Sequence, residues 1–99
     1  MVRHIVFWKL NGATAEQKRT QAVEIKKALE ALNGRIPGLL KLEVGIDFSA
    51  TDESADVALY SEFESRAALE VYARHPDHVA VLPIVKAARS ERRVVDYEA

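Results

Sequence analysis

The chain has 99 residues, a length typical of one domain, so we expect a single domain over residues 1–99. Its 14 Lys and Arg nearly balance its 15 Asp and Glu, which gives no electrostatic reason to expect a nucleic-acid or membrane partner. Hydrophobic residues make up 48% of the chain, enough for a packed core, and the absence of cysteine excludes disulfides and thiolate metal sites. This composition suits a cytoplasmic protein.

Strand and helix signals alternate along the first third of the chain. Residues 2–10 are rich in β-branched and aromatic side chains, which predicts a strand, and they are too short and too charged for a signal peptide or membrane span. Thr14 and Gln17 match a capping box, which predicts the start of a helix. This helix ends at Gly34, since glycine can adopt the left-handed backbone of a helix end.

Two more strands are predicted in the middle of the chain. From residue 40 to residue 48, apolar side chains alternate with polar ones, and the apolar positions are Leu40, Leu42, Val44, Ile46 and Phe48. Residues 56–63 form a third strand, with one face made of Val57, Leu59 and Phe63. Both segments are typical of half-buried strands.

The last third begins with two short helices. Ser65 can cap a helix that ends near His75, and Pro76 suits the first turn of the next one. The buried side of the second helix is predicted to consist of Val79, Leu82 and Val85. Pro83 is expected to break or restart this helix, and residues 92–98 form the final strand.

The predicted order β-α-β-β-α-β indicates a ferredoxin-like α+β domain, an antiparallel sheet with helices on one side. The opposite face of the sheet would still carry apolar and aromatic side chains: Ile5, Phe7, Ala58, Tyr60, Val95 and Tyr97. Leaving this set in water would forfeit about 10 kcal/mol, which is as large as the net stability of a typical domain. We therefore expect a homodimer that forms through this outer face of the sheet.

The densest cluster of chemically active side chains lies between the last two helices. Tyr72, His75 and His78 fall within seven residues, in a chain with only three histidines and three tyrosines. His78 is the candidate general base, because imidazole is the side chain whose ordinary pKa suits proton removal beside a carbonyl near neutral pH. Tyr72 is the candidate donor to a carbonyl oxygen on which negative charge develops.

Each of these residues also has a structural interpretation. Tyr72 and His78 can be packed, hydrogen-bonded residues. His75 is a candidate pocket-lining residue, but it also suits a capping role because the proline after it disfavours helical backbone. His4 and Trp8 share one face of the first strand, where they are either pocket-lining or ordinary core residues.

Other site types receive less support. A metal site is the sharper alternative for the histidines, with the nearby ligands His75, His78, Asp77 and His4, but no recognised ligand spacing is present. The sequence has no phosphate-binding glycine motif, and we expect neither a metal nor a cofactor. A group of arginines indicates a solvated helix end and strand start rather than an anion site: Arg89, Arg92 and Arg93.

Several short segments carry a family resemblance that extends over essentially the whole chain. They are His4-Ile5-Val6, Ile36-Pro37-Gly38-Leu39, Glu62-Phe63-Glu64-Ser65, Tyr72, His75-Pro76-Asp77-His78 and Val94-Val95-Asp96-Tyr97. In this order they resemble the stress-responsive dimeric α/β-barrel (Dabb) family. The resemblance implies two ferredoxin-like protomers whose sheets press together into a shared β-barrel with the helices outside.

The resemblance also implies two kinds of function. A plant relative is a polyketide cyclase that performs an intramolecular aldol condensation; its working Tyr and His resemble Tyr72 and His78, and a pocket His resembles His4. Another pocket His of that enzyme corresponds to Val57, so its substrate does not carry over. We expect a pocket for a small aromatic or polyketide-like carbonyl compound, with cofactor-free proton-transfer or aldol-type chemistry. The alternative is a non-enzymatic, stress-linked structural or binding dimer.

Overall fold

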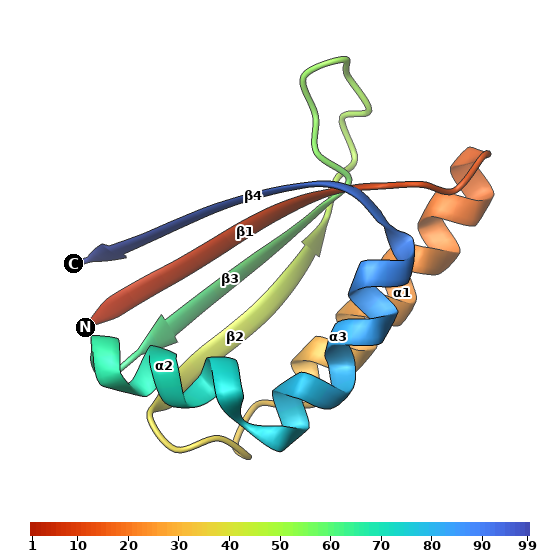
Figure 1. Cartoon of the computed structure of the whole chain (residues 1–99). Helices are drawn as coiled ribbons and strands as arrows, with labels where there is room; N and C mark the ends of the chain where they lie inside the picture. The colour runs from red at the N-terminus through yellow and green to blue at the C-terminus, as the bar shows by residue number, and fades with distance from the viewer.

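The computed structural model describes residues 1–99 as a four-stranded antiparallel sheet with all three helices on one face (Figure 1). The strand order across the sheet is β2-β3-β1-β4, so the first and last strands of the chain lie side by side. In chain order the elements are β1 (Val2–Leu10), α1 (Ala15–Glu30), β2 (Leu39–Ile46), β3 (Val57–Phe63), α2 (Arg66–Arg74), α3 (Pro76–Ala88) and β4 (Arg89–Glu98). The ferredoxin-like α+β fold predicted from the sequence is confirmed.

The core lies between the helices and the inner face of the sheet. Val6 of β1, Leu59 and Phe63 of β3 and Ile25 of α1 are at most 2% exposed, and they meet in one continuous apolar cluster. Alternation along each strand sends every second side chain into this layer. No helix of the chain has the length and apolar character needed to cross a bilayer.

The outer face of the sheet carries the opposite set of side chains. Phe7 is 43% exposed, and Val95 and Tyr97 on β4 are 47% and 40% exposed. Ile5 lies directly opposite Val95 on β4 and Tyr60 on β3, so these apolar groups form one surface across three strands. No helix covers this face (Figure 1). The apolar outer face predicted from the sequence is therefore present.

Several predicted boundaries differ from the structure. Helix α1 begins after its Thr14 cap as expected, but it ends at Glu30 and passes through a turn before Gly34, whose φ is +78°. Strand β2 ends at Ile46, and Phe48 lies beyond it with 97% of its surface exposed. The alternation of apolar and polar residues extends to Phe48, but the chain leaves the sheet after Ile46 and enters a polar loop. The predicted strand was therefore too long at this end.

The last helix and strand also depart from the prediction. Pro83 lies inside α3 without ending it, and β4 begins at Arg89, three residues earlier than residue 92. On α3 the buried residues are Val81, Val85 and Ala88. Val79 was predicted to be buried but is 47% exposed, because the helix directs Val81 and Val85 into the core instead.

One glycine fixes the position of α2 against the sheet. Gly38 lies just before β2 with φ of +80°, a backbone conformation that favours glycine. A Cβ atom at this position would lie 2.5 Å from Cβ of Ala68 on α2. The absence of a side chain at Gly38 therefore allows α2 to pack closely beside the start of β2.

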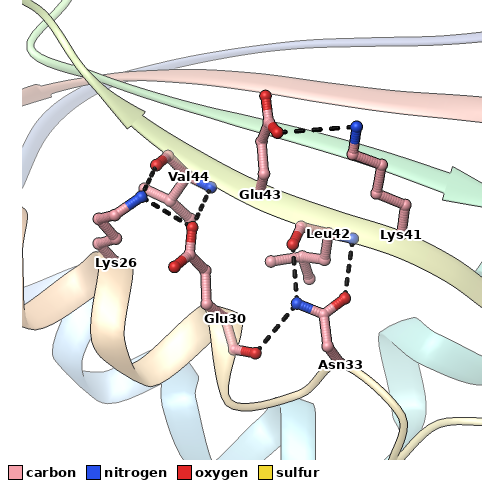
Figure 2. A network of polar contacts seen from close by, with 7 residues as sticks. All are labelled: Lys26, Glu30, Asn33, Lys41, Leu42, Glu43 and Val44. Atoms are coloured by element: carbon pink, nitrogen blue, oxygen red, sulfur yellow. Dashed lines mark hydrogen bonds and ion pairs between the residues drawn. The ribbon is translucent and has the colours of Figure 1, made fainter.

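Side chains from α1 and the turn after it close the free edge of β2 (Figure 2). Asn33 donates to the Leu42 carbonyl oxygen at 2.8 Å and accepts from the Leu42 amide at 3.0 Å. Glu30 accepts from the Val44 amide at 3.0 Å, while Lys26 donates to Glu30 and to the Val44 carbonyl oxygen. The hydrogen bonds from Lys26 and the Val44 amide lower the pKa of Glu30. This edge is thus unavailable to another strand.

We expect Asn33→Ala to destabilise the fold by about 1–2 kcal/mol, because two hydrogen bonds to β2 are lost. Urea unfolding followed by circular dichroism measures the change. The matched control is Lys41→Ala, which removes an exposed ion pair to Glu43 and an exposed contact with the Tyr60 ring and should change stability by less than about 1 kcal/mol. Equal stability of Asn33→Ala and the wild type would contradict this role for Asn33.

Candidate functional site

A cavity of about 360 Å³ lies between the inner face of the sheet and helices α2 and α3. Its lining is mostly apolar, with side chains from β1, β3, β4, α1, α2 and α3. Four of the five site residues predicted from the sequence line it: His4, Trp8, Tyr72 and His78. The two residues from β1 thus lie in the same cavity as two residues that follow them by 64 positions or more, because β1 lies inside the sheet below the α2–α3 junction.

Tyr72 lies in the last turns of α2 and is only 2% exposed. Its ring meets the Phe63 ring edge-on, with centroids 5.0 Å apart, and this packing holds it against the sheet. Its hydroxyl group is buried and has no hydrogen-bond partner. Burial raises the pKa of Tyr72 above its ordinary value, so the phenol keeps its proton. The site therefore holds a protonated, unpartnered donor.

His78 lies in the first turns of α3, and its ring centroid is 4.1 Å from that of Tyr72. Its Nδ1 donates to the carbonyl oxygen of Ala73 at 3.3 Å, which leaves Nε2 with a free lone pair in the neutral ring. Desolvation lowers the pKa of His78 below 6.5, and the neighbouring His4 and His75 act in the same direction. At neutral pH His78 is thus an uncharged base.

His75 takes the capping role that the sequence indicated and is not one of the cavity-lining residues. It stands between α2 and α3, with an extended backbone imposed by Pro76. Its Nδ1 accepts from the Asp77 amide at 3.1 Å and caps α3, while its own amide donates to the Tyr72 carbonyl oxygen at 3.2 Å. His75 therefore sets the angle between the two helices that carry Tyr72 and His78.

His4 projects from β1 into the same cluster, with its ring centroid 6.2 Å from that of Tyr72. Asp96 on β4 lies directly opposite it and pairs with its Nδ1. The hydroxyl of Ser61 donates to the His4 carbonyl oxygen at 2.7 Å and anchors the strand at this point. The hydrogen bond between His4 and Asp96 orients the imidazole and leaves its Nε2 on the side away from Asp96.

Sequence reasoning missed Asp96 as a site residue. It appears in the sequence within Val94-Val95-Asp96-Tyr97, where a single acidic residue in a strand has many interpretations. The register of β1 against β4 decides its position, because that register pairs His4 with Asp96. The same register could have been inferred from the alternation of both strands if β1 and β4 had been known to be neighbours.

Trp8 closes the other end of the cavity. Its side chain is 5% exposed, and its indole Nε1 is buried without a hydrogen-bond partner. It lies opposite Arg92 on β4, and Arg92 also lines the cavity together with Lys86 and Arg89. Two of the arginines that the sequence indicated as solvated are therefore part of the cavity wall.

The histidines do not converge as metal ligands. No group of three or more His, Asp or Glu side chains lies close enough together to hold a metal ion. The rings of His4 and His78 each pack against Tyr72, with centroids 6.2 Å and 4.1 Å from the Tyr72 centroid. What the arrangement offers is a neutral base, a phenol donor and a carboxylate-oriented imidazole beside an apolar hollow.

The model of the stress-responsive A/B barrel domain (Dabb) family matches residues 2–99. The chain belongs to the Dabb family. The resemblance deduced from the sequence motifs is thus confirmed over almost the whole chain. A comparison with curated proteins finds no match.

Solved structures agree with this assignment. A Bacteroides fragilis protein described as dimeric, of unknown function and ferredoxin-like fold is 38% identical, with a TM-score of 0.88 over 99% of this Dabb chain and 95% of that one. A dimeric ferredoxin-like protein of unknown function from Thermobifida fusca is 26% identical, with a TM-score of 0.82 over 99% and 90%. A hydroxynitrile lyase from Passiflora edulis shares the fold at 20% identity, with a TM-score of 0.72 over 97% and 90%.

The lowered pKa of His78 predicts a pH dependence of folding stability. The unfolded chain binds a proton at His78 near pH 6.5, whereas the folded protein binds it only at lower pH. Stability contributed by the neutral His78 is therefore fully present above pH 6.5 and is lost as the pH falls through the folded-state pKa. We expect the urea midpoint to drop more between about pH 7.5 and pH 5.5 in the wild type than in His78→Gln. Parallel pH profiles of the two proteins would contradict the assignment.

Proposed function

We propose that this Dabb protein binds a small aromatic or polyketide-like carbonyl compound in its cavity and catalyses a cofactor-free proton transfer next to the carbonyl group. The observation that carries the proposal is the pairing of His78 with Tyr72. Their ring centroids are 4.1 Å apart, both line the cavity, and the buried Tyr72 hydroxyl lacks a partner. A buried hydroxyl group without a hydrogen-bond partner costs stability. The presence of such a group in Tyr72 is explained if a ligand atom accepts its hydrogen bond.

The two residues would have complementary roles. His78 Nε2 would accept a proton from the carbon beside the carbonyl, because Nδ1 already donates to Ala73. Tyr72 would donate its hydroxyl to the carbonyl oxygen, where negative charge develops as the enolate forms. The enolate carbon could then attack a second carbonyl of the same molecule, and the proton held by His78 would pass to the new alkoxide. This second step is an aldol closure.

His4 and Asp96 would support this chemistry from beside Tyr72. The hydrogen bond between their side chains fixes the imidazole of His4 next to the Tyr72 ring. A fixed wall at this point restricts how the substrate carbonyl can approach the phenol, and such positioning contributes to rate. Asp96 would act through His4 and is a positioning residue.

The proposal is tested with a simple ketone rather than an assumed natural substrate. We expect the protein to accelerate exchange of the benzylic protons of 1-phenylpropan-2-one for deuterium, measured by proton NMR in D₂O. His78→Gln should lower the exchange rate by about 10²–10⁴-fold and Tyr72→Phe by about 10²–10³-fold. Exchange should rise with pH and level off above pH 6.5, because the pKa of His78 lies below this value.

The matched control for these variants is His75→Asn. Asparagine can still cap α3, and His75 lies outside the cavity, so the exchange rate should stay close to the wild-type value. Wild-type exchange no faster than that of buffer alone would remove the catalytic part of the proposal and leave a binding or structural role. A rate unchanged in His78→Gln would remove His78 as the base.

We also propose that residues 1–99 act as one domain that forms a homodimer through the outer face of its sheet. Support comes from the exposed apolar surface of Ile5, Phe7, Val95 and Tyr97, and from relatives described as dimeric. Arg3 lies over the Tyr97 ring at 5.9 Å and gives this surface a polar border. The cavity lies on the other face, so pairing would leave it accessible.

We expect Phe7→Asp to dissociate the dimer, because it places a charge at the centre of the apolar face. Light scattering gives the mass of each species. The matched control is Val23→Asp on α1, whose side chain is equally exposed at 45% but lies away from this face. A dimeric Phe7→Asp protein would place the interface elsewhere.

A further inference from the structure

Three basic side chains line one end of the cavity. Lys86 comes from the end of α3, and Arg89 and Arg92 come from β4. None of the three takes part in an ion pair, although four other ion pairs are present in the protein. Lys86 and Arg92 are exposed and Arg89 is half-buried, so these cations lie where the apolar hollow opens to water.

The register of β1 against β4 separates the two ends of the cavity. His4 lies opposite Asp96, Val6 lies opposite Val94, and Trp8 lies opposite Arg92, all on the inner face. Four residues along a strand span about 13 Å. The polar cluster of His4 and Tyr72 therefore lies about 13 Å from the cationic end along β1, with an apolar stretch between them.

Each end also contains a buried donor without a partner. At the first end it is the Tyr72 hydroxyl, and at the second it is the indole Nε1 of Trp8. Both side chains are at least 95% buried, and both line the cavity. An oxygen atom of a bound molecule at the Trp8 end would lie close to Arg92, the cross-strand neighbour of Trp8.

We propose that the ligand of this cavity is an amphipathic oxo acid, with its carbonyl group at Tyr72 and His78 and a carboxylate at the cationic end. Arg92 and Arg89 hold the carboxylate, Lys86 adds long-range attraction, and the apolar walls cover the body of the molecule. The inference rests on the proposed function for the carbonyl end and adds the anionic end. It assigns Arg92 as a specificity-determining residue.

The test compares oxo acids with neutral analogues of the same shape. The probes are 7-oxo-7-phenylheptanoate and 11-oxo-11-phenylundecanoate, each measured against its primary amide, and the longer one can span the distance between the two ends. Because Trp8 is the only tryptophan, its indole N–H gives a single resonance that reports on the cavity in a ¹⁵N-correlated NMR titration. We expect at least one acid to bind about fivefold or more tightly than its amide, and this preference to shrink as salt increases.

Variants identify the residues responsible. Arg92→Gln should remove most of the preference for the acid, with little effect on amide binding, and Lys86→Gln at an exposed helix position should reduce it to a smaller extent. The control is Arg74→Gln, which makes the same change of charge at an exposed position outside the cavity. It should keep the wild-type preference.

The outcomes separate this inference from the proposed function. If acid and amide shift the Trp8 resonance with equal affinity, the proposed carboxylate site is wrong while the carbonyl site stands. The same conclusion follows if Arg74→Gln loses the preference for the acid as much as Arg92→Gln does. If no probe shifts the Trp8 resonance, the cavity does not take this class of compound and both proposals fall. If binding occurs with the expected preference but proton exchange is absent, only the catalytic role is overturned.

Discussion

The central position of β1 in the sheet is the constraint on which the rest of the molecule depends. Its two neighbours, β3 and β4, fix its register on both sides, so every second side chain must point to the same face. His4, Val6 and Trp8 therefore face the helices, while Ile5 and Phe7 face outward. A shift of one residue would exchange the two sets. The cavity and the exposed apolar surface are thus two consequences of one register.

The second constraint is the break between α2 and α3. Pro76 cannot continue a helix from α2, and His75 satisfies the first free amide of α3. The break brings Tyr72 and His78 ring to ring, although they belong to different helices. The residues that hold this angle are local, whereas the surface that receives the two rings comes from β1 and β3. Chemistry at this site therefore depends on both the junction and the sheet.

The cavity has a chemical gradient along its length. At the Tyr72 end lie a phenol, an uncharged imidazole and the His4–Asp96 pair; at the Trp8 end lie an indole donor and three cations. Between them the lining is apolar. Such a layout suits a molecule with two polar ends and a hydrophobic body, which buries most of its surface and orients itself by its ends. The fold itself does not dictate this gradient, because the Passiflora edulis structure has the same fold and is only 20% identical to this chain.

The sequence by itself determined the elements, the two-faced sheet and the local cluster of Tyr72, His75 and His78, because alternation, capping and proline act over a few residues. It also gave the family, through motifs spread along the chain. Only the tertiary structure decided that Asp96 orients His4 and that Arg89 and Arg92 belong to the cavity wall. These features depend on which strands are neighbours and in what register, and contacts across 84 residues or more of sequence, such as Trp8 with Arg92, leave no local signal.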